Sequence, residues 1–180
     1  KAITHPLRSD LPIYLGAAGP KNVALAAEIC AGWIPLWYSA YREEVYADSL
    51  RNAPDHFDIV QGVTVAVTDD LESAYDALRP MLGFYIGGMG SKDRNFHKEL
   101  MARMGFPEQA QTIQDEFLAG RRAEAIAAVP NEFIDEIALI GSKERIRDRL
   151  QAWKESRVTT MLIHAADPMK LQEIAELVMD

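Results

Sequence analysis

The chain has 180 residues, 48% of them hydrophobic, and a formal net charge of −8. This length and composition predict one domain with a sizeable buried core. The net negative charge argues against nucleic-acid and anionic-membrane partners, because both require clustered lysine and arginine. No apolar run reaches the ~18 residues of a membrane span, residues 1–10 contain no secretory core, and the single Cys30 cannot form an internal disulfide. We therefore expect a cytoplasmic protein with neither nucleic acid nor membrane as a partner.

Apolar runs typical of strands alternate with helical patterns along the chain, after a polar linker at 1–10. Strands that alternate with helices pair in parallel with right-handed crossovers, so this order predicts an α/β fold. About four such units can form an open sheet or half of a barrel, and the pattern does not separate the two. The expected strands are 12–16, 33–38, 58–68 and 159–164. The expected helices are 21–31, 41–51, one capped by Asp69 or Asp70, one from Pro130 through Ile137, 143–155 behind Gly141 and Ser142, and 169–179.

Two prolines are expected to disturb these elements. Pro35 falls within the second strand, where proline is tolerated only at an edge or a bulge. Pro80 falls within the helix that follows Asp70 and is expected to kink it.

Residues 84–129 have a helical pattern without a strand, and an insertion of this size usually serves as a lid or a subunit contact. A glycine-rich break is expected at 87–90, and Gly105 and Gly120 separate three shorter helices. Three side chains beside the break are candidates for a substrate pocket on a movable element: Phe84, Tyr85 and Met89.

The segment from Leu11 to Trp33, LPIYLGAAGPKNVALAAEICAGW, combines a short strand, a small-residue loop and the start of a helix. Small residues let the backbone approach an anion, and proline at the first helical position costs no hydrogen bond. The free N–H groups and the positive end of the helix dipole then face the ligand, and Lys21 adds a mobile positive charge. An ordinary strand-to-helix turn is the alternative, because neither GxGxxG nor GxxxxGK[ST] is present.

The same segment resembles the luciferase-like monooxygenase superfamily, in the branch that uses the deazaflavin coenzyme F420, where PIYLGA runs into GPKNVELAAEIADGW. Three further stretches fit that family in the same order: GWIPLWYS at 32–39, LGFYIGGMGSKDRNFHKELMARMGF at 82–106 and ALIGSKERIRDRLQAWKESRVTTMLIHA at 138–165. The resemblance implies a (β/α)8 TIM barrel of which residues 1–180 are the C-terminal half, with about four βα units plus a helical insertion at about 84–129. Half a barrel leaves two open strand edges and an uncovered inner layer of Val, Ile and Leu. We therefore expect roughly 150 or more further residues before Lys1.

The resemblance also implies where the coenzyme binds. Ligands of such barrels lie at the C-terminal ends of the strands, and the loop after the first strand would hold the phosphate or the adjacent ring of the deazaflavin. Asn22 is a further candidate there, and Ser39 is expected either to supply a hydroxyl or to cap a helix. The family's catalytic residues lie mostly in the first half of its barrel, so none is named. The implied cofactor-binding residues are Gly16, Ala17, Ala18, Gly19, Pro20, Lys21 and Ser39.

The four histidines are too scattered for a metal site. His164, at the end of the last strand, is the best lone titratable group, with a satisfied structural histidine as the alternative. His97 stands among charged neighbours on a helix and is expected to be solvated. His5 and His56 are expected in loops.

Aromatic residues cluster around the second expected strand: Trp33, Trp37, Tyr38 and Tyr41. Alternation along that strand would put Trp33 and Trp37 on one face and Tyr38 on the other. The cluster is expected either to wall a planar ring system or to pack in the core.

By resemblance, the chain is part of an F420-dependent oxidoreductase that transfers hydride between the coenzyme and an organic substrate, with the half-length chain inactive alone. An FMN-dependent monooxygenase on the same fold is one alternative, because a deazaflavin lacks the nitrogen that forms the oxygen adduct. A non-catalytic barrel fragment or subunit-pairing module is the other. The expected partners are the missing N-terminal half-barrel, a small-molecule substrate and further copies in a homo-oligomer.

Overall fold

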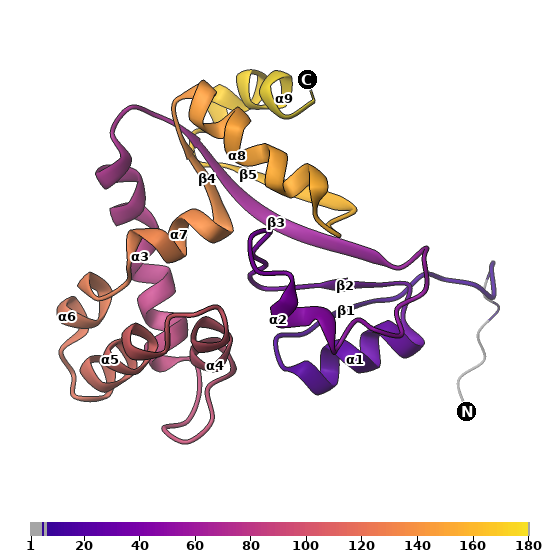
Figure 1. Ribbon diagram of the computed structural model, residues 1–180, viewed down its shortest axis with the longest axis horizontal. Coiled ribbons are helices and arrows are strands. Elements are labelled where there is room, and N and C mark those ends of the chain that lie inside the picture. The colour runs from indigo at the N-terminus through magenta and orange to yellow at the C-terminus, as the bar shows by residue number, and fades with distance from the viewer. Residues whose placement is uncertain (1–4, 6, 180) are drawn as a thin grey trace.

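The structure is a computed structural model that describes residue 5 and residues 7–179. In this part of the chain, five strands form one parallel sheet flanked by helices, which confirms the predicted α/β fold (Figure 1). The strands are β1 (Tyr14–Gly16), β2 (Gly32–Ile34), β3 (Asp58–Val67), β4 (Ala138–Gly141) and β5 (Thr160–Ala165). The helices are α1 (Pro20–Ile29), α2 (Glu44–Ala47), α3 (Leu71–Gly88), α4 (Phe96–Arg103), α5 (Pro107–Leu118), α6 (Arg122–Ala127), α7 (Asn131–Ile137), α8 (Lys143–Glu155), the 3-10 helix η1 (Pro168–Lys170) and α9 (Leu171–Met179).

β3 is the centre of the sheet and is paired along both of its edges. The even-numbered Asp58 and Thr68 donate their N–H groups towards β2 and β4, so these two strands share one edge. The odd-numbered carbonyls of Ile59 and Val65 accept hydrogen bonds from the side of β5, which occupies the other edge. Within the described residues β1 pairs only with β2 and β5 only with β3, so the sheet has an unpaired strand edge at each end.

The two faces of β3 differ in burial. From Ile59 to Val65, its odd-numbered side chains are at most 1% exposed: Ile59, Gln61, Val63 and Val65. Its even-numbered residues are partly exposed on the opposite face, which we call the inner face: Val60, Gly62, Thr64 and Ala66. The expected inner layer of Val, Ile and Leu is therefore wrong for β3, where only Val60 belongs to that class.

Two strand predictions need correction. β2 ends at Ile34 rather than at residue 38, because Pro35 has no N–H to continue the ladder. β4 is absent from the predicted strands, because its four residues follow α7 directly, with no turn residues to separate helix from strand. The other three strands lie where they are expected, with ends shifted by no more than two residues.

α3 begins as predicted at Asp70, whose carboxylate accepts a hydrogen bond from the N–H of Ser73 at 3.1 Å. The helix continues through Pro80, Gly87 and Gly88, so the break expected at 87–90 begins only after Gly88. The expected kink at Pro80 stays a prediction.

Glycines in α3 serve close helix packing. A Cβ added to Gly87 would lie 2.5 Å from the Cβ of Phe117 in α5, so α5 approaches α3 where a larger residue would collide. The three shorter helices expected after it are α4, α5 and α6. Gly105 and Gly120 lie in the turns between them with φ of 93° and 81°, a conformation that favours glycine.

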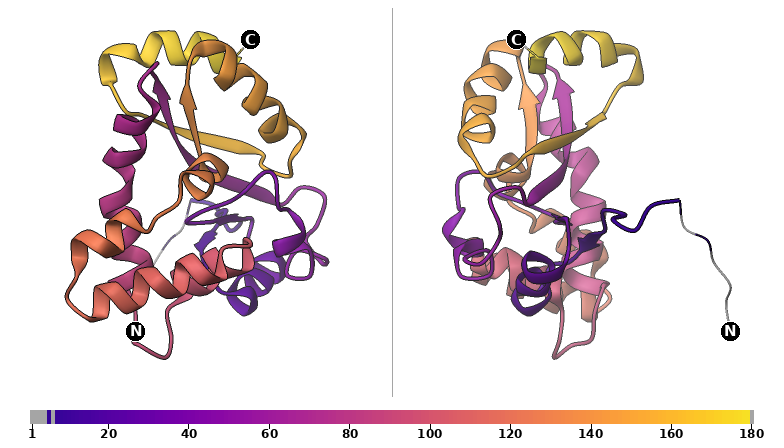
Figure 2. Two further views of the ribbon diagram at one scale, coloured as in Figure 1. Left: turned by 60° about the vertical axis from the view of Figure 1, so that its left-hand side comes forward. Right: turned by 90° about the vertical axis from the view of Figure 1, so that its right-hand side faces the viewer.

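The remaining helix ends follow their capping signals. Ser142 caps α8 by accepting a hydrogen bond from the N–H of Arg145 at 3.3 Å. The helix expected at 41–51 is much shorter, since only α2 is helical there. The segment 7–13 is exposed and runs away from the sheet, in agreement with the predicted linker (Figure 2). Within the described residues, none of the helices combines the length and apolarity that a membrane crossing needs.

Candidate functional site

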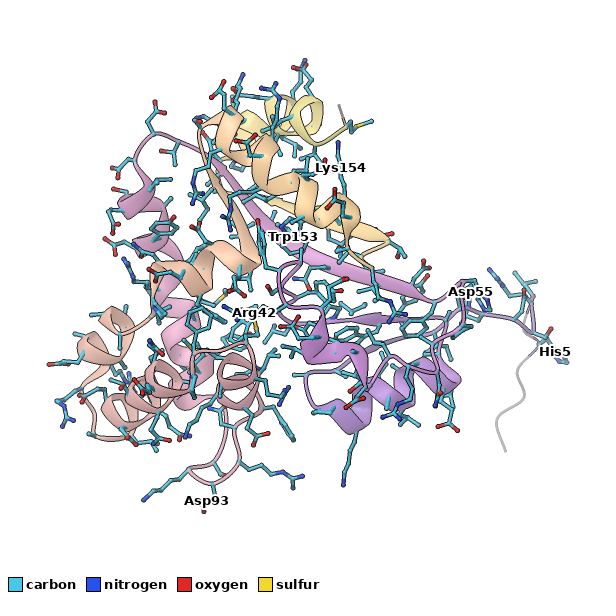
Figure 3. All side chains as sticks on the ribbon, viewed as in Figure 1. His5, Arg42, Asp55, Asp93, Trp153 and Lys154 are labelled. Carbon is cyan, nitrogen blue, oxygen red and sulfur yellow. The ribbon has the colours of Figure 1, made fainter. Side chains whose placement is uncertain are left out.

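The loop after β1 opens into a cavity of about 600 Å³, which we call the α1 cavity. The first turn of α1 forms one wall, and the loop between α3 and α4 forms the other, with Asp93 at the tip of that loop (Figure 3). Two basic and two acidic side chains line the cavity, together with apolar surface. Its lining residues are Gly19, Pro20, Lys21, Asn22, Asp93, Arg94, Phe96 and Glu99.

Side-chain donors fix the carbonyl groups of the small-residue loop. The indole Nε1 of Trp33 donates to the Ala17 carbonyl at 2.8 Å, and the Arg103 guanidinium donates to the Ala18 carbonyl at 3.2 Å. Within the described part of the chain, the backbone N–H groups of Ala18, Gly19 and Lys21 have no recorded acceptor. The loop therefore presents donors without acceptors at the start of a ten-residue helix, which is the arrangement that binds an anion.

Gly19 is the N-cap residue of α1, and no side chain caps this helix. A Cβ at Gly19 would lie 3.4 Å from the ring of Phe96, so the α4 side of the cavity closely approaches the loop. Arg94 lies over the ring of Phe96, with its guanidinium carbon 5.5 Å from the ring centre. Arg94 and Arg103 are not among the predicted site residues, because they belong to the insertion at 84–129 and only the fold brings them to the loop after β1.

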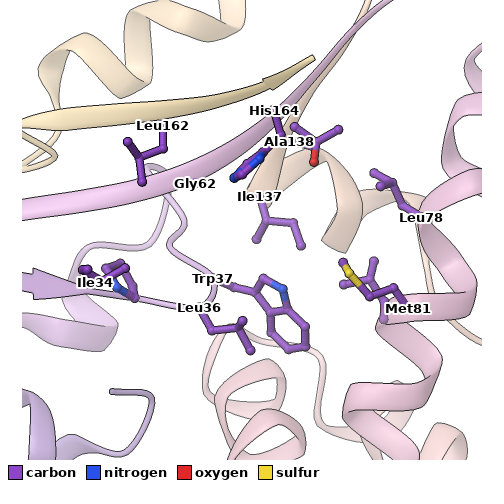
Figure 4. A pocket seen from close by; sticks show the side chains of 13 residues that line it. Ile34, Leu36, Trp37, Gly62, Leu78, Met81, Ile137, Ala138, Leu162 and His164 are labelled. Atoms are coloured by element: carbon purple, nitrogen blue, oxygen red, sulfur yellow. The ribbon is translucent and has the colours of Figure 1, made fainter. Parts of the chain in front are cut away.

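A second cavity, of about 400 Å³, lies on the inner face of the sheet, and we call it the inner pocket. Figure 4 shows Leu78 and Met81 of α3 on one side of it, with Ile34 and Leu162 on the other. Among the residues that the structure describes, no aspartate, glutamate, lysine or arginine lines it. Its lining residues are Ile34, Pro35, Leu36, Trp37, Gly62, Thr64, Leu78, Met81, Leu82, Ile137, Ala138, Leu162 and His164.

His164 stands in the inner pocket on β5, with Thr64 of β3 as its pairing partner. Its ring lies over Gly62, where an added Cβ would be 2.9 Å from the imidazole Nε2. His164 is exposed, and no hydrogen bond to its imidazole is recorded within the described residues. This geometry does not support a satisfied structural histidine and leaves both ring nitrogens available to a ligand.

The aromatic cluster divides between the core and the inner pocket. Trp33 and Tyr38 are buried and pack around Tyr46, with Tyr38 stacked on it at 4.9 Å between ring centres. Trp37 lines the inner pocket and contacts Phe133 of α7 instead. The shared face expected for Trp33 and Trp37 is wrong, because β2 ends before Trp37 and the alternation ends with it.

His97 is not the solvated histidine that its charged neighbours predict. Its ring packs 5.7 Å from Trp37 and 5.0 Å from Tyr85, and its Nδ1 is buried without a partner among the described residues. Burial lowers the pKa of His97 below its usual value. The first turn of α4 therefore lines the α1 cavity through Phe96, and its His97 packs against Trp37, which lines the inner pocket.

Ser39 is fully buried. Its hydroxyl donates to Glu136 at 2.8 Å and accepts from the N–H of Tyr41 at 3.2 Å, and Arg42 pairs with the same glutamate at 2.7 Å. These contacts join the loop after β2 to α7, and the expected contact between Ser39 and a cofactor stays a prediction.

The candidates Phe84, Tyr85 and Met89 line neither cavity. The α3 side chains that do line the inner pocket lie earlier along the helix: Leu78, Met81 and Leu82. The helix was expected to break near residue 87, but it continues to Gly88. The part of α3 that faces the inner pocket lies earlier, beside the sheet.

The family model described as luciferase-like monooxygenase matches residues 1–160. The chain belongs to the luciferase-like monooxygenase family. A Mycobacterium tuberculosis protein provisionally named a coenzyme F420-dependent oxidoreductase is 38% identical over 99% of this chain and 54% of its own length. The 5,10-methylenetetrahydromethanopterin reductase of Archaeoglobus fulgidus is 25% identical over 85% of this chain and 48% of its own length. The chain thus spans about half the length of the curated relatives it matches.

Solved structures agree on the fold. The coenzyme F420-dependent tetrahydromethanopterin reductase from Methanopyrus kandleri matches with a TM-score of 0.66 and 23% identity, over 94% of this chain and 49% of that one. An F420-dependent secondary alcohol dehydrogenase matches with a TM-score of 0.61 and 15% identity, over 96% of this chain and 50% of that one. The expected luciferase-like α/β fold is confirmed, and the chain covers about half of the homologous barrels.

Proposed function

We propose that this chain supplies the C-terminal half of an F420-dependent oxidoreductase that transfers hydride between the coenzyme and a small organic substrate. Family membership supports the proposal, as does 38% identity over 99% of the chain to a protein provisionally named for that activity. The structural observation that carries it is the α1 cavity, where backbone donors without acceptors lie beside Lys21 and Arg94.

The α1 cavity fits the phosphate group of F420. The N–H groups of Ala18, Gly19 and Lys21 would donate to phosphate oxygens at the positive end of the α1 dipole. Asp93 and Glu99 also line the cavity and oppose an anion, so the backbone donors are the decisive contacts. When bound, the coenzyme supplies the hydride chemistry, while the protein supplies position and shielding from water.

The unpaired edges of β1 and β5 support a second part of the proposal. Open edges invite pairing with further strands, and further strands before β1 would close the sheet into a barrel. We expect the half-length chain alone to be inactive, because a barrel site is assembled from loops of both halves. A homo-oligomer with contacts through 84–129 and α9 belongs to the same proposal.

The test is a fluorescence titration of the full-length protein with F420 and, separately, with FMN. In Gly19→Asp, the new carboxylate would accept hydrogen bonds from the first-turn N–H groups and repel the phosphate. We expect F420 affinity to fall about 100-fold, since charge-assisted hydrogen bonds contribute about 1.5–3 kcal/mol each. Folding stability should stay level or rise slightly, because aspartate is a preferred N-cap residue.

Gly19→Ala is the matched control. Its Cβ meets only the exposed ring of Phe96, so F420 affinity should change by no more than about twofold. Unchanged F420 binding in Gly19→Asp would contradict the assignment of the cavity. Tight binding of FMN together with none of F420 would favour the monooxygenase alternative.

A further inference from the structure

The inner face near the C-terminal ends of β3 and β5 is unusual for a barrel interior. Barrel interiors are normally filled by layers of bulky branched side chains. Towards its C-terminal end, the inner face of β3 carries only Gly62, Thr64 and Ala66. This half of the barrel therefore leaves space where a packed core layer would stand.

His164 occupies that space in a way that depends on Gly62. A side chain at residue 62 would collide with the imidazole, since even a Cβ would lie 2.9 Å from its Nε2. Glycine inside a strand weakens the strand, and the space that His164 needs accounts for glycine at residue 62. His164 is also the last residue but one of β5, at the end of the strands where ligands of such barrels bind.

The chemistry of the pocket defines what it would take. Apart from Thr64, His164 and the indole N–H of Trp37, its lining is apolar, and no residue with a permanent charge lines it within the described part of the chain. A charged group placed there would lose its hydration without gaining a partner, which is strongly unfavourable. A hydroxyl or carbonyl oxygen would gain a hydrogen bond from the imidazole or from the Thr64 hydroxyl.

We propose that the inner pocket binds the organic substrate, that this substrate is uncharged and largely apolar around its reacting carbon, and that His164 hydrogen-bonds its carbonyl or hydroxyl oxygen. This inference rests on the proposed function, since the substrate is the hydride partner of the coenzyme. His164 is thus a substrate-contacting residue, and the pocket selects against anionic and cationic groups.

The competing possibility is that side chains from the other half of the barrel fill the pocket. In that case His164 would be a core residue with its imidazole inaccessible. The test therefore uses the full-length protein loaded with F420 and follows the His164 ring by ¹⁵N NMR, assigned by its loss in His164→Leu.

The probes are three molecules of similar size that differ in charge: cyclohexanone, cyclohexanecarboxylate and cyclohexylammonium. We expect cyclohexanone to shift the His164 ring signals saturably, and the two charged probes to bind at least tenfold more weakly. His164→Leu should weaken cyclohexanone binding about threefold to tenfold, the effect of one hydrogen bond. His56→Leu, a histidine in an exposed loop, should leave cyclohexanone binding unchanged.

Two results would overturn the inference: no probe reaches the His164 ring in F420-loaded protein, or a charged probe binds as well as cyclohexanone. The NMR readout on the unaltered protein decides the matter even if His164→Leu fails to fold. F420 loading is measured independently by fluorescence, so absent F420 binding with an intact cyclohexanone response would reject the proposed function rather than the pocket.

Discussion

The α1 cavity and the inner pocket lie on two sides of the first turn of α4, which lines the first and packs against a lining residue of the second, and they differ in chemistry. Phe96 of α4 faces the loop at Gly19, and the next residue, His97, packs against Trp37 of the pocket wall. Four charged residues and backbone donors line the α1 cavity. Among the described residues, no aspartate, glutamate, lysine or arginine lines the inner pocket. The difference shows that one helix turn can separate a cavity lined by charged groups from a pocket lined mainly by apolar ones.

The largest predicted effect on stability comes from Asn95, the buried N-cap of α4, because this residue holds the first turn of α4 in place. Its side chain accepts hydrogen bonds from the N–H groups of His97 and Lys98 and donates to the Ile86 carbonyl at 2.7 Å. Asn95→Ala should lower the free energy of unfolding by about 2 kcal/mol, from a lost cap and an unsatisfied carbonyl. Denaturant unfolding of the full-length protein measures it.

The same variant should weaken both F420 and cyclohexanone binding, because both cavities lose the position of α4. Asn52→Ala, at an exposed residue, is the control and should change neither stability nor binding. If Asn95→Ala weakens binding at only one of the two cavities, then α4 does not support both.

A smaller effect separates the two cavities. Arg94→Ala removes a cation from the α1 cavity and should weaken F420 binding about threefold to tenfold, with no change in cyclohexanone binding. Lys92→Ala removes an exposed cation from the same loop but outside the cavity lining, and should have no effect on either. Titrations of each variant at low and high salt check this, since screening should shrink only the Arg94 effect. Equal losses in both variants would indicate a diffuse electrostatic attraction instead.

Local patterns in the sequence predicted the parts of the molecule that depend on neighbouring residues. The α1 segment was predictable because strand, small loop and Pro20 are contiguous, and the caps at Asp70 and Ser142 because capping is local. β4 was not predictable from local patterns, because its residues lie between two helices without turn signals. They form a strand through pairing with β3.

The site was less predictable than the fold, because its contacts come from distant segments. Arg103 reaches the Ala18 carbonyl across 85 residues of chain, and Gly62 makes room for His164 across the β3–β5 pairing. His97 shows the same limit, since its charged neighbours indicate solvent while the fold packs its ring against Trp37 and Tyr85.

The smallest predicted effect is a pH dependence carried by His97. Burial lowers the pKa of this imidazole in the folded protein, so the unfolded chain binds a proton more readily. The stability that depends on neutral His97 is therefore present above the unfolded value of about 6.5 and is lost as the pH falls below it.

His97→Phe keeps an aromatic ring packed against Trp37 and Tyr85 and removes the titration. Unfolding free energies measured from neutral to mildly acidic pH should fall less steeply in this variant than in the unaltered protein. His56→Phe, in an exposed loop, should keep the original slope. An unchanged slope in His97→Phe would contradict the role given to burial of His97.

A structure of the full-length protein with F420 would show whether the α1 cavity holds the phosphate of the coenzyme. We expect the phosphate to accept hydrogen bonds from the N–H groups of Ala18, Gly19 and Lys21, with Arg94 beside it and the inner pocket open to the substrate. A phosphate bound elsewhere, with the first turn of α1 left in contact with solvent, would contradict it.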